Sequence, residues 1–229
     1  MDIEELSAMI PSETVREYVR DTDWTFTDLQ KAVLLYQSEL PLEEKRSYLK
    51  DLYGKTADEK LQKELKDCLR DDRTFHNEYL EFAYIEVPNP FERGDIVRFV
   101  GTEDYGIVET PQKEWKEDYA RYHSDEWKQT GIDRDFSDVQ IRVAFLGDDG
   151  TFGHSHVNPI CLERYQPQED WIDGSPMDKL LLCASDLYRG KGSLDELYCL
   201  AAEYRKFKKK SKKQPWCRIS PHFNDIFYP

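Results

Sequence analysis

The sequence predicts an α+β protein with an N-terminal helical bundle, a central small antiparallel β-barrel of SH3-like type that carries a helical insertion, and C-terminal helices. Apolar residues recur every three or four positions up to about residue 87 and again after residue 168, as in helices packed on one face. Between these regions the pattern alternates, with Val139, Ile141, Val143 and Phe145 predicted on one face and Gln140 and Arg142 on the other. We therefore predict a helical domain over 1–87, a small β-barrel module over 88–167 and a C-terminal helical region over 168–229.

Capping signals predict where the N-terminal helices begin and end. Ser12 is suited to cap a helix that runs to about residue 20, and Thr27 with Gln30 forms a capping box for the next helix. Pro41 favours the first turn of a third helix, which Gly54 is placed to end.

A second capping box predicts the last helix of this region. It pairs Thr56 with Glu59 and precedes a long amphipathic pattern that continues to about Glu86. Pro88 and Pro90 then stop the helix.

Short strands and turns follow in the central region. Residues 96–100 and 105–108 are predicted to pair as strands, and an insertion over 111–131 has helix-like spacing. Asp149-Gly150 predicts a two-residue hairpin, in which both central positions need positive φ, before a return strand over 151–157. A short last strand is expected at 160–162.

Two helices are predicted after the barrel. Ser175 and Pro176 mark the start of the first, and Ser193 with Glu196 marks the start of the second. Pro215 ends the second helix, and an aromatic tail follows.

Composition limits the class of protein. Among 229 residues, 13% are aromatic, which is too many for a disordered acidic chain. No apolar run approaches the roughly 20 residues that cross a bilayer, and the acidic first residues lack the basic start of a secretory signal. We expect a cytoplasmic protein with no membrane partner.

The five cysteines of the sequence contain no CxxC pair and are expected to be free thiols.

The net charge of −14 is unevenly distributed. Residues 1–90 hold 21 acidic against 12 basic side chains, residues 91–175 hold 19 against 9, and residues 176–229 hold 6 against 11. An acidic body repels phosphate backbones and attracts basic surfaces. We expect a protein partner with a basic surface, although acidity that serves only solubility is the simpler alternative.

His154, His156 and Cys161 are the candidate metal ligands. A His-x-His pair on a strand places both rings on one face, and Cys is also a zinc ligand. A fourth ligand with suitable spacing is missing, so a strand-face pair and a core thiol explain the same residues. Cys161 with either histidine is also a conceivable nucleophile and base, but no orienting group or oxyanion hole is evident in the sequence.

Known catalytic and cofactor motifs do not occur. The sequence has no phosphate-binding GxxxxGK[ST], no GxSxG and no HExxH. We therefore assign no catalytic residue and no cofactor from the sequence.

A lysine run is the feature most typical of nucleic-acid binding. Its six members are Lys206, Lys208, Lys209, Lys210, Lys212 and Lys213. Lysines at a helix C-terminus also favour the macrodipole, and they can dock onto the protein's own acidic surface.

The predicted insertion is rich in aromatic side chains that favour protein interfaces. Trp115, Tyr119, Tyr122 and Trp127 are the candidate partner-binding residues. Packing over the barrel would explain them equally well.

Several segments resemble uncharacterised proteins that are carried on phages and conjugative elements of gram-positive bacteria. The segments are 2–20, 24–31, 89–97, 150–154 and 188–195. The resemblance implies a mobile-element context and transfers no functional residue.

We therefore predict a non-catalytic acidic interaction protein of a mobile element. The most specific version of this prediction is that the protein inhibits a host defence nuclease, in the way that anti-CRISPR proteins do. One alternative is a small-barrel nucleic-acid adaptor that uses the lysine run. A further alternative is a metal-dependent hydrolase at His154 and His156.

Overall fold

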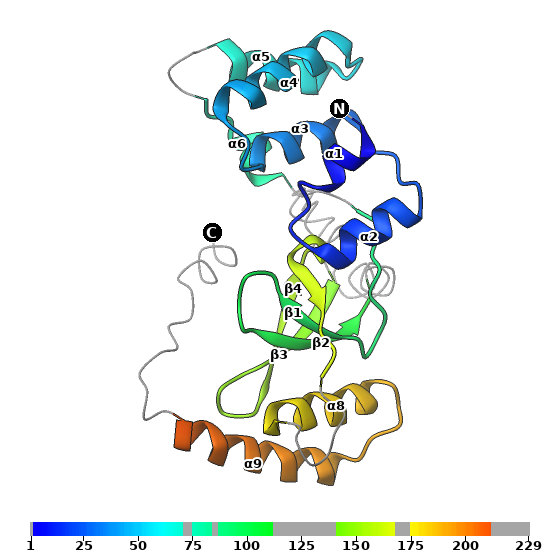
Figure 1. The fold of residues 1–229 in the computed structure, drawn as a ribbon, viewed down its shortest axis with the longest axis vertical. Helices are drawn as coiled ribbons and strands as arrows, with labels where there is room; N and C mark the ends of the chain where they lie inside the picture. Colours follow the sequence, from blue (N-terminus) through cyan, green and yellow to red (C-terminus); the bar gives the residue numbers. More distant parts are fainter. Residues whose placement is uncertain (1, 71–74, 84–86, 112–140, 168–174, 212–229) are drawn as a thin grey trace, which may run out of the picture.

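The computed structural model describes residues 2–70, 75–83, 87–111, 141–167 and 175–211. Figure 1 shows the N-terminal helices at one end, a β-sheet in the middle and two helices at the other end. The protein is thus a mixed helix and sheet structure, as the sequence predicts. Of the helices in these ranges, none is long and apolar enough to span a membrane.

The N-terminal helices are α1 (Ile3–Ser7), α2 (Glu13–Asp21), α3 (Asp28–Gln37), α4 (Leu42–Lys55), α5 (Glu59–Arg70) and α6 (Glu78–Phe82). The predicted cap at Ser12 is confirmed, because its side chain accepts a hydrogen bond from the Val15 amide. The Thr27–Gln30 capping box is also present in full.

Three expectations for this region are wrong. Gly54 does not end its helix, because α4 continues through Lys55. The Asp58 side chain, rather than Thr56, accepts from the Leu61 amide in the first turn of α5. The long helix is also interrupted: α5 ends at Arg70, and α6 begins after a new cap at Asn77.

The central region forms an open antiparallel sheet. Its strands are β1 (Ile96–Phe99), β2 (Tyr105–Thr110), β3 (Ile141–Leu146), β4 (Phe152–Val157) and β5 (Leu162–Arg164), in the order β4-β3-β2-β1-β5. The edge strands β4 and β5 are not paired with each other, so the described sheet is not closed. The predicted SH3-like barrel is therefore not confirmed.

The β3–β4 hairpin has a longer turn than predicted. The Gly150 amide donates to the Gly147 carbonyl, and the Gly147 amide donates to the Thr151 carbonyl. Gly150 has a φ of 76°, whereas neither Asp148 nor Asp149 has a positive φ. The two-residue turn is wrong, and a longer turn with one left-handed glycine takes its place.

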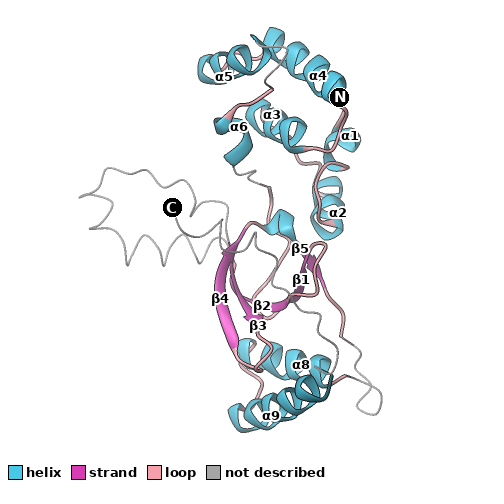
Figure 2. Ribbon diagram, turned by 90° about the vertical axis from the view of Figure 1, so that its left-hand side faces the viewer, coloured by secondary structure: helices cyan, strands magenta, loops and turns pink. Residues whose placement is uncertain are grey.

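Each face of the sheet packs against different helices (Figure 2). Side chains of one face, including Val97, Val108 and Val143, join the core of the N-terminal helices. The opposite face, with Ile96 and Ile107, packs against α8 (Pro176–Tyr188). Helix α9 (Leu194–Ser211) packs on α8 and contributes to a neighbouring core cluster.

The larger core crosses a predicted boundary. It extends from Leu6 in α1 to Leu162 in β5. The Ser12 hydroxyl, beside α2, donates to the Leu162 carbonyl. The boundaries at residues 87 and 167 stay predictions.

Candidate functional site

A polar cluster surrounds the carboxylate of Glu109 on the α8 face of the sheet. The Glu109 side chain, on β2, is only 12% exposed. Its Oε2 lies 2.9 Å from Arg142 Nε on β3 and 2.8 Å from His154 Nδ1 on β4. Its Oε1 accepts a 2.6 Å hydrogen bond from the Tyr188 hydroxyl of α8. One carboxylate therefore joins three strands and a helix.

The surroundings of Glu109 keep Tyr188 protonated. Burial raises the pKa of Tyr188, and the hydrogen bond and negative charge of Glu109 raise it further. A hydrogen-bonded carboxylate also fixes the orientation of the ring that it contacts. The cluster thus holds His154 in a defined position on the sheet surface.

His156 lies near this cluster. It is opposite Arg142 in the β3–β4 register, and His154 is opposite Ala144, so both histidines lie on one face of the sheet, as predicted. This is the face that packs against α8. Burial lowers the pKa of His156, and Arg142 and His154 lower it further against the opposing effect of Glu109. This environment favours the neutral imidazole of His156.

Cys161 does not join the histidines. It ends the short 3-10 turn Pro159–Cys161 and packs against the core on the opposite face of the sheet. Burial raises the pKa of its thiol to about 11, which disfavours the nucleophilic thiolate. No group of three or more possible ligands gathers anywhere in the described ranges. The structure therefore does not assemble the metal or nucleophile site at these residues.

The lysine run is partly engaged with the protein itself. Lys206, Lys209 and Lys210 are exposed at the C-terminal end of α9. Lys208 forms a 3.0 Å ion pair with Asp148 in the β3–β4 turn, and its ammonium lies 5.6 Å from the Tyr204 ring centroid. Lys212 and Lys213 lie outside the described residues, as do the aromatic candidates Trp115, Tyr119, Tyr122 and Trp127.

An acidic row on α2 is a feature that the sequence analysis missed. Val15 and Val19 anchor this helix in the core, while Glu13, Glu17 and Asp21 are exposed at intervals of four residues. Residues four apart on a helix lie on the same face, roughly 6 Å apart along the axis. None of the three carboxylates forms an ion pair with any other described residue. The spacing of four residues between these acidic side chains could have revealed the row in the sequence.

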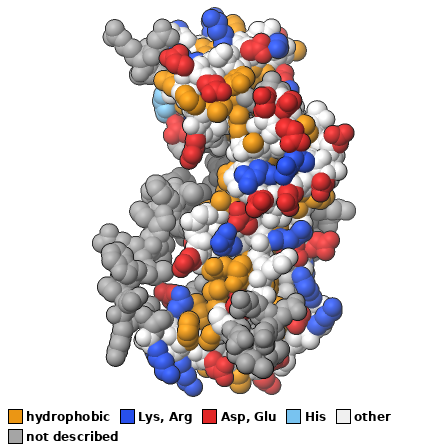
Figure 3. All heavy atoms as spheres, viewed as in Figure 1, with side chains coloured by type: hydrophobic (Ala, Val, Ile, Leu, Met, Phe, Trp, Pro, Cys, Tyr) orange, Lys and Arg blue, Asp and Glu red, His pale blue; other side chains and the backbone are white. Residues whose placement is uncertain are grey.

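The surface view shows how charge is distributed over one face of the molecule. In Figure 3, acidic and basic side chains are interspersed over the N-terminal helices, with a basic group where α2 lies, and another basic group lies at the C-terminal end of α9. In the sequence, residues 1–90 have a negative balance of charge and residues 176–229 a positive balance. The two ends of the elongated molecule therefore differ in charge.

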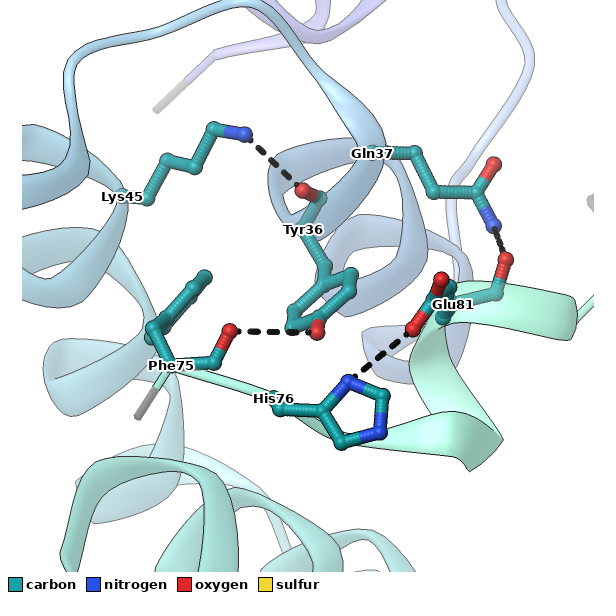
Figure 4. A pocket seen from close by; sticks show the side chains of 6 residues that line it. All are labelled: Tyr36, Gln37, Lys45, Phe75, His76 and Glu81. Carbon is teal, nitrogen blue, oxygen red and sulfur yellow. Dashed lines mark hydrogen bonds and ion pairs between the residues drawn. The ribbon is translucent and has the colours of Figure 1, made fainter. Parts of the chain in front are cut away.

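A pocket of about 600 Å³ lies among α3, α4 and α6. Figure 4 shows the side chains that line it: Tyr36, Gln37, Lys45, Phe75, His76 and Glu81. Its volume is within the range of small-molecule sites. None of these residues was singled out in the sequence, because they come from α3, α4, α6 and the segment before α6, which only the tertiary structure brings together.

The comparisons with known proteins supply no relative. The chain matches no family model, no curated protein and no solved structure.

Proposed function

We propose that this protein is a non-catalytic interaction protein whose acidic α2 face binds a basic partner. The observation that carries the proposal is the exposed row of Glu13, Glu17 and Asp21. Such a row presents regularly spaced negative charge from a helix that is held rigidly by its buried valines. Electrostatic complementarity of this kind steers association and selects basic surfaces.

The charge of α2 is mixed. Glu13, Glu17 and Asp21 carry three negative charges, and Arg16 and Arg20 of the same helix carry two positive charges. Each arginine lies three residues after a glutamate, a spacing that favours opposite charges by roughly 0.2–0.5 kcal/mol per pair. The row therefore offers its partner three carboxylates flanked by two guanidinium groups.

The most specific version of this proposal is that the partner is a defence nuclease, and that the acidic face occupies a groove that binds nucleic-acid phosphates. This identification is supported by the charge of α2 and by the resemblance of segments 2–20 and 24–31 to mobile-element proteins. Carboxylates that replace phosphates in such a groove would bind in a strongly salt-dependent way.

The test is competition with nucleic acid. Purified bacterial defence nucleases would be assayed for DNA cleavage with the wild-type protein and with the triple variant Glu13→Gln, Glu17→Gln, Asp21→Asn. We expect the wild type to inhibit a nuclease at low salt, with inhibition falling steeply as salt rises, and the variant to lose most of this inhibition.

A matched control removes three negative charges elsewhere. Glu92, Glu103 and Asp104 are exposed next to strands β1 and β2, so Glu92→Gln, Glu103→Gln, Asp104→Asn changes the net charge equally. This control should inhibit like the wild type. Equal loss in both triple variants would show that only net charge matters and would remove α2 as the binding face.

A second candidate function is nucleic-acid binding by the basic end of α9. The exposure of Lys206, Lys209 and Lys210 favours it. The engagement of Lys208 with Asp148 leaves fewer lysines for phosphate contacts than the sequence offers.

Substitution tests this candidate better than truncation. Tyr204 is only 3% exposed, so a chain that ends before it would lose part of its core. The variant Lys206→Gln, Lys209→Gln, Lys210→Gln leaves the core intact. If the adaptor function is correct, the wild type should shift DNA or RNA in a gel and this variant should bind more weakly with a smaller salt dependence. Absence of a shift for the wild type would exclude the adaptor.

A further inference from the structure

We propose that the pocket among α3, α4 and α6 binds a small organic anion with a flat ring, either an aromatic carboxylate or a mononucleotide. This site is separate from the acidic face of α2. Lys45 supplies a cation that has no carboxylate partner among the described residues, and Tyr36 and Phe75 form an aromatic wall in a frame held by hydrogen bonds (Figure 4).

Lys45 supplies the positive charge. Its side chain is half-buried, and its ammonium donates a 3.0 Å hydrogen bond to the Tyr36 carbonyl at the end of α3. An ammonium has three donors, so this bond leaves two for other acceptors. Lys45 makes no ion pair with a carboxylate among the described residues. A cation in this position favours an anionic ligand, because charge-assisted hydrogen bonds are strong in a partly desolvated site.

The acidic residue of the pocket has its own cation nearby. His76 Nδ1 lies 3.1 Å from Glu81 Oε2, which is an ion pair when the imidazole is protonated. His76 Nε2 also lies 3.9 Å from Glu78 Oε1, so the imidazole lies between two carboxylates. At the other end of the pocket, a cationic ligand would have to lie near Lys45 and near Arg46, whose guanidinium is 5.8 Å from the Phe75 ring centroid. That end of the pocket thus disfavours a cation.

Aromatic rings form one wall. Tyr36 and Phe75 stack with ring centroids 5.0 Å apart and an interplanar angle of 23°. Stacking with Phe75 uses one face of the Tyr36 ring. Both rings line the pocket, and both side chains are half-buried. Offset stacking of flat rings is favourable and tolerates different ring types.

Hydrogen bonds hold this wall in place. The Tyr36 hydroxyl accepts a 2.9 Å hydrogen bond from the Asn77 amide, and burial raises the pKa of Tyr36, so the phenol stays neutral. The Gln37 amide donates to the carbonyls of Leu80, Glu81 and Ala83 at 2.9–3.1 Å, which ties the end of α6 to α3. A frame that is formed before binding avoids the entropy of ordering it.

Isothermal titration calorimetry and NMR would test the site with two probes, adenosine monophosphate and 4-hydroxybenzoate. Adenosine and inorganic phosphate serve as partial ligands that lack the charge or the ring. We expect saturable binding of at least one probe, with shifts of the His76 ring resonances, and weaker binding of both partial ligands. Binding of one probe alone would identify which anionic group the site prefers.

Variants locate the binding. Lys45→Gln should lower the affinity for the probe by roughly tenfold or more, because it removes a charge-assisted contact. Lys45→Arg keeps the charge and should retain most of the affinity. Lys50→Gln is the matched control, since Lys50 is exposed on the same helix and does not line the pocket.

Two results would overturn the proposal. One is failure of both probes to bind wild-type protein at concentrations up to about 10 mM, which corresponds to negligible affinity. The other is equal binding by wild type, Lys45→Gln and Lys50→Gln, with circular dichroism showing all three folded. Neither result would bear on α2, because its partner is a protein and its residues lie outside the pocket.

Discussion

Tyr188 on α8 donates a 2.6 Å hydrogen bond to Glu109 on β2, and this bond ties the C-terminal helices to the sheet. Tyr188→Phe removes the donor and leaves the largely buried carboxylate with two partners instead of three. Because hydrogen bonds to charged groups are stronger than neutral ones, we expect the free energy of unfolding to fall by roughly 1–3 kcal/mol. Urea denaturation followed by circular dichroism would measure this change.

Tyr198→Phe on α9 is the matched control for that measurement. Tyr198 is 67% exposed, so loss of its hydroxyl should leave stability within about 0.5 kcal/mol of wild type. If the two variants were equally stable, the bond between Tyr188 and Glu109 would not contribute to the docking of α8.

The β3–β4 turn lies against α9, with Gly150 next to the Ala201 backbone. Gly150→Ala would place a methyl carbon 2.9 Å from the Ala201 carbonyl oxygen, at a φ of 76°. Gly101→Ala is the comparison, because Gly101 has the same φ but no atom within 4 Å of the added carbon.

Backbone strain alone should destabilise the Gly101 variant by roughly 1–2 kcal/mol. The Gly150 variant should lose more, because the turn must also move away from α9. Thermal unfolding of the two proteins would show the difference. Equal melting temperatures would mean that the turn is not packed tightly on α9.

Local signals in the sequence predicted the local structure well. The caps at Ser12 and Thr27 depend on a side chain that reaches an amide three residues away, and both are confirmed. The alternation around Ile141 and Val143 likewise predicted which side chains enter the core. The shared face of His154 and His156 followed from the same period of two.

The features that could not be predicted from the sequence depend on contacts between residues far apart in the chain. Whether the sheet closes depends on where β5 adds, and it pairs with β1 through partners such as Val97 and Arg164, far from the β4 edge. No local pattern encodes that choice. The polar cluster required the register of three strands and the docking of α8, so His154 was predicted as a candidate without Glu109 and Tyr188.

Acid should destabilise the protein in part through His156. Burial lowers the pKa of this imidazole below its ordinary value of 6.5, with Arg142 and His154 acting in the same direction and Glu109 against it. The unfolded chain therefore binds a proton at a higher pH than the folded chain. The resulting stability is present above about pH 6.5 and is lost as the pH falls through the folded-state pKa.

The measurement compares wild type with His156→Gln. Free energies of unfolding at about pH 7.5 and pH 5 would be taken from urea titrations. Other groups titrate in both proteins, so the informative quantity is the difference between them. The variant should lose less stability than wild type over this interval. An equal or larger loss in the variant would contradict a neutral, half-buried His156.

The cysteines should differ sharply in their reaction with iodoacetamide. Burial raises the pKa values of Cys68 and Cys161 to about 11, compared with 9.0 for an ordinary thiol, so each holds roughly 100-fold less thiolate than an ordinary thiol at pH 8. Cys199 is exposed on α9. Peptide mapping by mass spectrometry should find Cys199 alkylated before Cys68 and Cys161 in the folded protein, with those two protected until urea unfolds it. Alkylation of Cys161 as fast as Cys199 in the folded protein would contradict its place in the core and would restore it as a candidate nucleophile.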